Sequence, residues 1–211
     1  MDRARLFVVS APSGCGKGTI LAKAFENRPV YYSVSYTTRE KREGEQEGVN
    51  YFYTSRKEFE KMIDDRDFLE YARFNDQYYG TPKIPVFEHL ARGIDVILEI
   101  ETQGALQVKK TYSDAVLLFI LPPCVDELKR RLKKRGTETD AEIEERFGHA
   151  KREICDSYRY DYVIMNDDLD KAVEDFLTVI DSVRVGDERA EQFSTDNDET
   201  VKSIERVLID A

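Results

Sequence analysis

Residues 9–19 read Val9-Ser10-Ala11-Pro12-Ser13-Gly14-Cys15-Gly16-Lys17-Gly18-Thr19, and this stretch decides the fold. It follows an apolar run, 6–9, that is typical of a buried strand, and it precedes a helix-prone segment, 20–25. Glycines allow the backbone to curl until several N–H groups point at one anion, and the first turn of a helix adds free N–H groups and a positive dipole end. With the charge of Lys17, this order of strand, loop and helix predicts a P-loop that binds the phosphates of a nucleoside triphosphate.

The loop departs from the usual pattern G-x-x-x-x-G-K-[ST] at two positions. Ala11 stands at the first glycine position, and Gly18 separates Lys17 from Thr19. The alternative is a glycine-rich turn with a surface lysine, which the position directly after a strand near the N-terminus disfavours. The hydroxyl that binds Mg²⁺ usually follows the lysine directly, so the inserted glycine leaves Thr19 as one candidate metal ligand among others.

Composition limits the classes of function. The chain has 211 residues, of which 41% are hydrophobic and 35% charged, as expected of one soluble α/β domain with small insertions. No apolar run approaches the roughly 20 residues that span a bilayer, and no secretion signal is recognisable, so we expect no membrane contact. The formal net charge of −10 disfavours a nucleic-acid polymer as partner, although arginines gathered in a cleft can still bind a small anion.

The three cysteines point to the compartment. Cys15, Cys124 and Cys155 are odd in number and widely spaced, which fits neither a disulfide framework nor a zinc site. A reducing cytoplasm is therefore the expected location. Cys15 is interpreted as a small filler residue in the loop, with an oxidisable thiol of lowered pKa as the alternative.

Strands and helices alternate along most of the chain. Buried strands are expected at 94–101, 115–121 and 160–166, and helices at 85–92, 104–110, 125–134 and 169–183. A capping box, Thr139 to Glu142, predicts the start of a long helix that runs to about residue 158. This alternation predicts a parallel sheet flanked by helices.

Residues 35–81 predict a small mixed β insert. A β-prone run, 31–39, leads into it, and a second short strand is expected at 49–53. Ser55 and Glu58 form a capping box for a helix that ends near residue 63, and two strands, 68–74 and 77–81, flank a turn. From residue 186 the chain is acidic and polar until a helical pattern returns at 201–209.

Two groups of arginines are candidates for phosphate binding. Arg39 and Arg42 lie in the polar loop of the insert, whereas Arg131 and Arg135 share one helix face and Arg146 lies on the next helix. Arginine suits phosphate because it is always charged and can donate two parallel hydrogen bonds. A solvated charged surface is the alternative for each group, and the P-loop makes the phosphate interpretation more favourable.

Carboxylates at strand ends are further candidates. Glu70 lies in an apolar and aromatic strand, where it either faces solvent or accepts two hydrogen bonds from a base with adjacent ring and exocyclic N–H groups, such as guanine. Glu99 and Glu101 end a buried strand on one face, where they could hold a substrate hydroxyl or a water bound to Mg²⁺.

These motifs together resemble the guanylate kinase family, most closely the bacterial form. The resemblance covers residues from about 5 to 183 and rests on the following segments in order: the loop 10–17, 33–39, 42–45, 51–52, 68–70, 78–81, 98–104, 120–123, 135–137 and 163–168. It implies a P-loop α/β fold with a helical lid and the transfer of the γ-phosphoryl group of ATP to GMP with Mg²⁺. Closure of the lid and insert is expected to exclude water.

The roles that the resemblance implies follow by position. The residues that contact ATP would be Ala11, Pro12, Ser13, Gly14, Cys15, Gly16, Lys17, Gly18, Thr19 and Asn166. The guanine base would be read by Ser35, Glu70 and Thr81. The phosphate of GMP would be held by Arg39, Arg42, Tyr51 and Tyr79, and Glu101 would also bind GMP. The catalytic groups would be Lys17, Arg39, Arg131, Arg135 and Arg146. Mg²⁺ would be bound by Thr19, or through water by Glu99 or Glu101.

The resemblance also implies an organisation: a core of 1–34 and 82–185 with a lid at 125–157, a GMP-binding insert of 35–81, and a tail of 186–211. Glu101 replaces the more common Asp, which leaves its contact open but keeps its charge. The alternatives are a non-catalytic protein-binding module of the same family, which typically lacks the P-loop lysine and the ATP-side arginines, and a kinase for another nucleoside monophosphate. ATP and GMP are the expected partners, and a homo-oligomer remains open.

Overall fold

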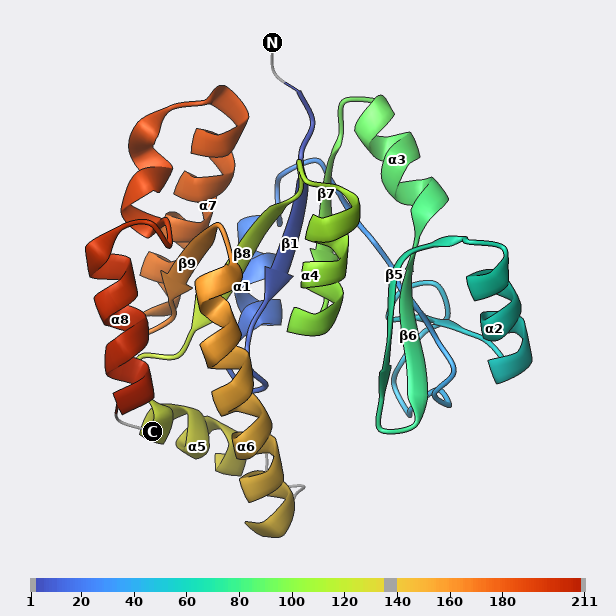
Figure 1. Ribbon diagram of the computed structural model, residues 1–211, viewed down its shortest axis with the longest axis horizontal. Helices are drawn as coiled ribbons and strands as arrows, with labels where there is room; N and C mark the ends of the chain where they lie inside the picture. Colours follow the sequence, from blue (N-terminus) through green and yellow to red (C-terminus); the bar gives the residue numbers. More distant parts are fainter. Residues whose placement is uncertain (1–2, 135–139, 210–211) are drawn as a thin grey trace. The chain divides into compact units, whose positions relative to one another are not determined.

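A computed structural model describes residues 3–134 and 140–209, with side chains described outside 134–146. Its contacts divide the chain into two compact units. One contains Val9–Arg28 and the chain from Val116 onward, and the other contains Arg3–Val8 and Pro29–Ala115. Each unit is described by itself below, with the element labels of Figure 1.

Within the described residues, a five-stranded sheet has the order β2-β7-β1-β8-β9. Its strands are β2 (Val30–Tyr32), β7 (Asp95–Glu99), β1 (Leu6–Ser10), β8 (Val116–Leu121) and β9 (Tyr162–Met165). Every residue of β1 and β8 is buried, as expected of strands with helices on both faces. The pairs β2–β7 and β8–β9 are parallel, which confirms the predicted α/β class with a parallel sheet.

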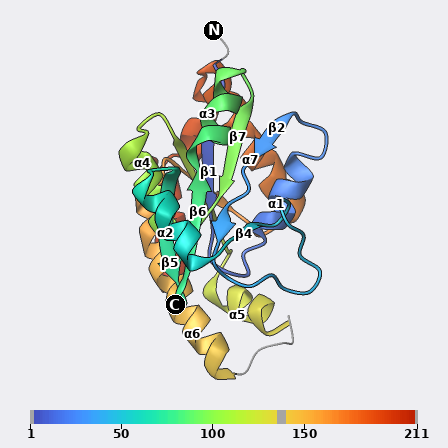
Figure 2. The same cartoon turned by 90° about the vertical axis from the view of Figure 1, so that its right-hand side faces the viewer.

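The unit that contains the glycine-rich loop is mostly helical. Its helices before the tail are α1 (Lys17–Ala24), α5 (Val125–Lys134), α6 (Asp140–Asp156), η1 (Ser157–Arg159) and α7 (Leu169–Val185). Edge-to-face packing of Phe25 on Phe176, with centroids 5.7 Å apart, joins the end of α1 to α7. Helices α5 and α6 lie beside each other (Figures 1 and 2). Thr139, the expected cap of the long helix, lies outside the described residues.

The second unit carries the predicted β insert as a separate sheet. Its four strands have the order β4-β3-β6-β5, with β3 (Tyr36–Thr37), β4 (Phe52–Tyr53), β5 (Phe68–Phe74) and β6 (Gln77–Pro82). The β3–β4 pair is parallel and the pairs of β6 with β3 and β5 are antiparallel, so the sheet is mixed as predicted. The unit also contains α3 (Lys83–Ala91) and α4 (Thr102–Thr111).

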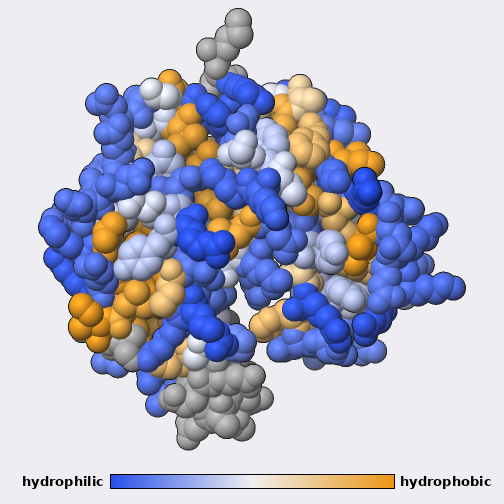
Figure 3. Space-filling model, in the orientation of Figure 1, coloured by the Kyte–Doolittle hydropathy of each residue, from blue (hydrophilic) through white to orange (hydrophobic). Residues whose placement is uncertain are grey.

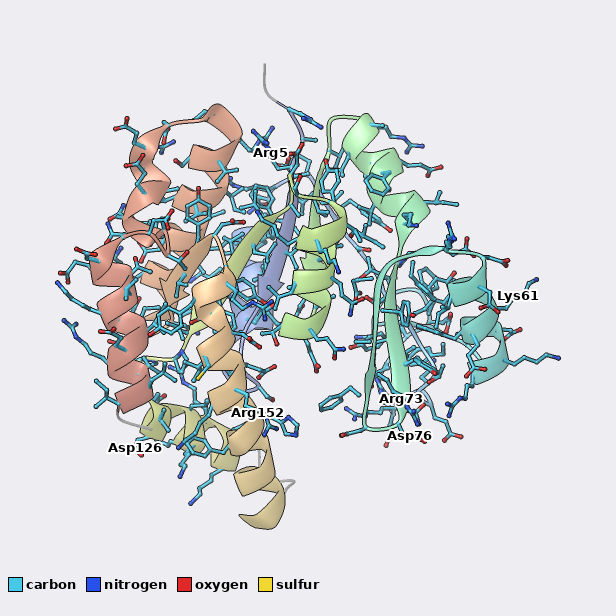
Figure 4. All side chains as sticks on the ribbon, viewed as in Figure 1. Arg5, Lys61, Arg73, Asp76, Asp126 and Arg152 are labelled. Carbon is cyan, nitrogen blue, oxygen red and sulfur yellow. The ribbon has the colours of Figure 1, made fainter. Side chains whose placement is uncertain are left out.

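The β5–β6 hairpin and α2 (Arg56–Asp64) form as the turn and cap residues predict. Asn75 and Asp76 both have positive φ, 46° and 65°, as a tight two-residue turn requires, and Arg73 pairs with Asp76 across it (Figure 4). Ser55 accepts a hydrogen bond from the N–H of Glu58, which confirms the capping box. Phe59 of α2 stacks on Phe68 of β5, with centroids 4.4 Å apart.

The β-prone run, 31–39, contributes to two strands. Its first part, β2, pairs with β7 in the parallel sheet, and its second part, β3, pairs with β6 in the mixed sheet. Between them the N–H of Ser33 donates to the carbonyl of Ile97 at 3.0 Å, the last bond to β7. β propensity marks both strands but carries no information about which sheet each one joins.

The acidic tail is part of the first unit. It forms η2 (Glu188–Phe193) and α8 (Asp198–Ile209), and α8 lies beside α6 (Figure 1). Ser194 bridges to Tyr162 of the edge strand β9, and the Thr195 hydroxyl donates to the carbonyl of Tyr160 at 2.6 Å.

Hydrophilic side chains dominate the visible face of the molecule (Figure 3). The boundaries expected at 35, 82 and 186 stay predictions.

Candidate active site

The loop after β1 has the geometry of an anion cradle. Gly14 and Gly16 have φ of 92° and 84°, in the left-handed region that favours glycine, and the N–H of Cys15 donates to the carbonyl of Pro12 at 3.1 Å. Helix α1 begins at Lys17, and Gly16 at its N-cap offers no side chain to its first N–H groups. The N–H of Thr19 donates to the carbonyl of Gly16 at 3.1 Å, and the positive end of the helix dipole favours an anion beside the loop.

The loop rests on the helices that follow β8. Cys15 is 1% exposed and forms an apolar cluster with Leu128, Leu132 and Ala150, against which Ala11 packs. A Cβ added at Gly14 would lie 3.1 Å from Leu132, so this glycine also permits the close approach of α5. Burial raises the pKa of the Cys15 thiol, which disfavours the oxidisable thiolate and supports the filler role.

Asn166 links the end of β9 to the loop. Its side-chain N–H donates to the carbonyl of Cys15 at 2.6 Å, and its own carbonyl accepts from the guanidinium of Arg131 at 3.2 Å. The Nε of Arg131 donates to the carboxylate of Glu127 at 2.7 Å. Hydrogen bonds from Arg130 and Arg131 lower the pKa of Glu127 to about 2. The structure thus brings two predicted ATP-side residues, Asn166 and Arg131, together with the loop.

Of the other residues predicted on the ATP side, the structure describes the side chain of Thr19 but not those of Arg135 and Arg146. Thr19 lies exposed in the first turn of α1. Arg146 belongs to α6, but its side chain lies outside the described residues, as does all of Arg135. Their predicted role in charge neutralisation stays a prediction.

In the second unit, sheet register aligns the three predicted base-reading residues. Strand β6 places Thr81 opposite Glu70 of β5. On its other side β6 pairs with β3 at Tyr36↔Gly80 and Thr37↔Tyr79. Ser35 directly precedes β3, so extending this antiparallel register by one residue brings it beside Thr81. Residues opposite one another on adjacent strands point to the same face of a sheet. Thr81 of β6 therefore lies in the middle of a row, with the carboxylate of Glu70 on one side and Ser35 on the other.

Glu70 is held in this row and is chemically perturbed. It is 6% exposed, and its Oε1 accepts from the N–H of Thr81 at 3.1 Å and from the Thr81 hydroxyl at 2.6 Å. Burial raises the pKa of Glu70 to about 7, further raised by the charge of Glu101 and partly offset by the two bonds from Thr81. A buried carboxylate with a raised pKa is a strong acceptor for a ligand that supplies N–H donors.

A cationic and aromatic cluster lies in the same unit. The Arg39 guanidinium lies over the ring of Tyr51, 5.5 Å from its centroid, and over that of Tyr53 at 6.0 Å. Tyr51 packs edge-to-face on Tyr79, with centroids 5.8 Å apart. Three of the four residues predicted to hold a phosphate are thus assembled, and the fourth, Arg42, has an exposed side chain next to them in the chain.

Glu45 contacts the predicted phosphate-binding arginines, and the sequence interpretation did not assign it a role. Its carboxylate binds both terminal nitrogens of Arg39, at 2.7 and 3.1 Å, and accepts from the N–H of Arg42 and the hydroxyl of Tyr53, each at 2.8 Å. These bonds, that of Arg39 above all, lower the pKa of Glu45 to about 2. One sign of this contact is visible in the sequence: Glu45 is a carboxylate in the same polar loop as Arg39 and Arg42, three residues after Arg42.

The strand-end carboxylates have different surroundings. Glu99 accepts a hydrogen bond from the Tyr32 hydroxyl, and burial with the charge of Glu99 raises the pKa of that tyrosine. Glu101 is the exposed N-cap residue of α4, and its charge reaches Glu70. The sequence interpretation did not single out Tyr32, which sits beside Glu99 because β2 and β7 are paired.

A central parallel strand that leads through a glycine-rich loop into a helix defines a P-loop nucleotide-binding protein of the α/β class. The family model for guanylate kinase matches residues 3–183. The chain belongs to the guanylate kinase family. This membership confirms the predicted family and fold class and favours the kinase over the non-catalytic module.

Similar proteins cover most of the chain. It is 51% identical over 190 residues to the guanylate kinase of Carboxydothermus hydrogenoformans, covering 90% of this chain and 93% of that one. The guanylate kinase of Vibrio cholerae is 44% identical over 198 residues, with 92% and 96% covered. The crystal structure of guanylate kinase from Anaplasma phagocytophilum superposes with a TM-score of 0.71 at 30% identity, covering 88% of this chain and 87% of that one.

None of the helices in the described ranges has both the length and the apolar character needed to cross a membrane.

Proposed function

We propose that this chain transfers the γ-phosphoryl group of ATP to GMP, giving ADP and GDP, in the cytoplasm. Membership of the guanylate kinase family supports the reaction. The observation that carries the choice of acceptor is the row of Ser35, Thr81 and Glu70. Guanine presents adjacent ring and exocyclic N–H groups that a carboxylate can accept together, and adenine does not.

On the acceptor side, Glu70 accepts hydrogen bonds from the guanine base. Thr81 positions the Glu70 carboxylate through two hydrogen bonds, and Ser35 lies beside Thr81 at the base. Arg39 and Arg42 bind the phosphate of GMP, with the hydroxyls of Tyr51 and Tyr79 as further donors. Glu45 fixes the Arg39 fork before the substrate arrives, which lowers the entropy lost on binding. Because the attacking group is a phosphate oxygen that already carries charge, this step needs no strong general base.

On the ATP side, the glycine-rich loop and the N-terminal end of α1 bind the phosphates, and Lys17 reaches their outer oxygens. Arg131 lies on the chain of bonds that leads through Asn166 to Cys15, so its charge is held close to the loop. Together with Arg135 and Arg146, it neutralises charge on the phosphoryl group in transit. Asn166 keeps the loop in shape and contributes to the adenine side.

The family also implies Mg²⁺ with ATP, and the residues fit it. Within residues 3–134 and 140–209, no group of three or more His, Cys, Asp or Glu side chains is arranged to hold a metal ion. Mg²⁺ does not need one, because it usually keeps several waters and binds substrate phosphates with one or two protein oxygens. The exposed Thr19 hydroxyl, or the exposed carboxylates of Glu99 and Glu101 through water, would serve. The bound ion would neutralise phosphate charge.

Two variants in separate sites test this proposal. Lys17→Ala should reduce turnover by at least about a hundredfold and leave the Kd for GMP within about twofold, because it removes charge from the transferring phosphoryl group. Glu70→Gln should raise the KM for GMP by about tenfold or more and leave that for ATP within about twofold. Calorimetric GMP binding and coupled ADP formation measure both. Equal losses for GMP and ATP in Glu70→Gln, or full turnover in Lys17→Ala, would contradict the assignment.

A further inference from the structure

Gly104 faces the carboxylate of Glu70. It lies in the first turn of α4, is buried, and belongs to the same compact unit as β5, which α4 contacts. A Cβ built on Gly104 would lie 2.5 Å from Oε2 of Glu70 and 3.1 Å from its carboxyl carbon. Real Cβ atoms do not approach an oxygen so closely, so any side chain at position 104 must displace something.

The carboxylate has little room to give way. Its Oε1 is held by the N–H and hydroxyl of Thr81, at 3.1 and 2.6 Å. On the helix side, the same added Cβ would lie 3.3 Å from the Cδ1 of Ile100. A methyl group at 104 therefore rotates the carboxylate away from Thr81 or pushes α4 off β5. Rotation is the smaller change, because Oε2 is the end of a flexible side chain.

The backbone gives no other reason for glycine at this position. Gly104 is not among the residues with positive φ, so every L-residue can adopt its conformation. Glycine destabilises a helix relative to alanine. The Glu70 carboxylate is the group that an alanine would disturb most, because it lies 2.5 Å from the added Cβ, against 3.3 Å for the Cδ1 of Ile100.

We propose that Gly104 is a positioning residue for guanine specificity: its missing side chain leaves the space in which the Glu70 carboxylate is held in line with Thr81 and Ser35. This inference rests on the proposed role of Glu70. It assigns to α4 the task of setting where the carboxylate lies, and it predicts that the size of residue 104 controls the affinity for the base and leaves the ATP site unaffected.

Gly104→Ala tests the inference. The expected result is a rise in the KM for GMP of about tenfold or more, with the KM for ATP and kcat at saturating GMP within about twofold, because a charge-assisted pair of hydrogen bonds is misaligned. A general packing defect would not separate the two substrates in this way. Gly148→Ala is the matched control: it makes the same change in helix α6, where an added Cβ meets nothing within 4 Å, and should leave both KM values unchanged.

A double-mutant cycle with Glu70→Ala separates this inference from the proposed function. With the carboxylate removed, adding Gly104→Ala should change the KM for GMP by less than about twofold, since residues that act through one contact are not additive. If Glu70→Ala alone leaves the KM for GMP unchanged, the proposed role of Glu70 fails. If Glu70→Ala raises it but Gly104→Ala has no effect, or has the same effect in both backgrounds, the role of Gly104 is overturned.

The cycle remains decisive if Gly104→Ala does not fold. The double variant, in which the methyl group has room, should then fold and unfold at the same urea concentration as Glu70→Ala alone. A double variant that also fails to fold would show that Gly104 serves helix packing and not the carboxylate, and would overturn the inference.

Discussion

If Glu70 binds guanine as proposed, we expect its ionisation to make GMP binding depend on pH. In the unliganded protein burial raises the pKa of Glu70 to about 7. The guanine N–H groups require the ionised carboxylate, so a proton must leave Glu70 when GMP binds at lower pH. Affinity is then weakened by the factor 1 + 10^(pKa − pH), which is about 11 at pH 6 and about 1.1 at pH 8. We predict that GMP binds about tenfold more weakly at pH 6 than at pH 8 for this reason alone.

The neighbours of Glu70 support the direction of this change. Thr81 donates to the carboxylate, which favours ionisation, whereas burial and the charge of Glu101 oppose it more strongly. Because the folded pKa lies above the usual value of 4.5, the unliganded protein gains protons relative to the unfolded chain between about pH 4.5 and 7. The contribution of Glu70 to the free energy of unfolding therefore falls as pH rises through that window. GMP offsets this loss because its N–H groups donate to the ionised carboxylate.

The assay is calorimetric titration with GMP from pH 5.5 to 8.5, for the natural sequence and for Glu70→Gln. The phosphate of GMP itself titrates near pH 6, and both proteins share that contribution. The ratio of their Kd values therefore isolates Glu70, and it should change about tenfold between pH 6 and 8. Parallel pH profiles of the two proteins would refute the linkage, as would GMP affinity that increases toward pH 6 in the natural sequence alone.

Three further predictions follow from named contacts. Glu45→Gln should raise the KM for GMP by about tenfold and spare that for ATP, because the bidentate partner of Arg39 is weakened; unchanged steady-state kinetics would exclude a positioning role. Asn166→Ala removes the side-chain N–H that donates to the buried carbonyl of Cys15. It should lower the free energy of unfolding in urea by about 1–3 kcal/mol and raise the KM for ATP. A loss of GMP affinity with an unchanged KM for ATP would contradict the assignment. A thiol reagent at pH 8 should modify exposed Cys155 quickly and buried Cys15 only on unfolding, as mass spectrometry of each peptide can show; rapid labelling of native Cys15 would disprove its inert filler role.

Local signals in the sequence predicted most elements and the site residues on them. The loop 10–17, the Ser55 capping box and the turn at Asn75-Asp76 each combine residues whose backbone or side-chain needs are specific, and the structure contains all three. The run 31–39 shows the limit. Both of its strands are β-prone, but whether a strand pairs with β7 or β6 depends on contacts far along the chain.

The relation between site residues depended on tertiary structure for the same reason. Ser35, Glu70 and Thr81 were named from motifs, but their alignment in one row follows from the register of three strands. Glu45 was visible as a charge between arginines, and only the fold shows its bidentate bond to Arg39. Nothing in the segment 98–104 reveals that Gly104 will face Glu70, because the two residues are joined by packing and not by spacing.

The most direct test of the account is a coupled assay of ADP formation with ATP and Mg²⁺, with GMP, AMP, UMP and CMP offered separately. The account predicts strong activity with GMP and activity at least about a hundredfold lower with the other three acceptors, because the buried Glu70 is left without matching donors by their bases. Activity with AMP equal to that with GMP, or no activity with any acceptor in a protein shown to be folded, would contradict it.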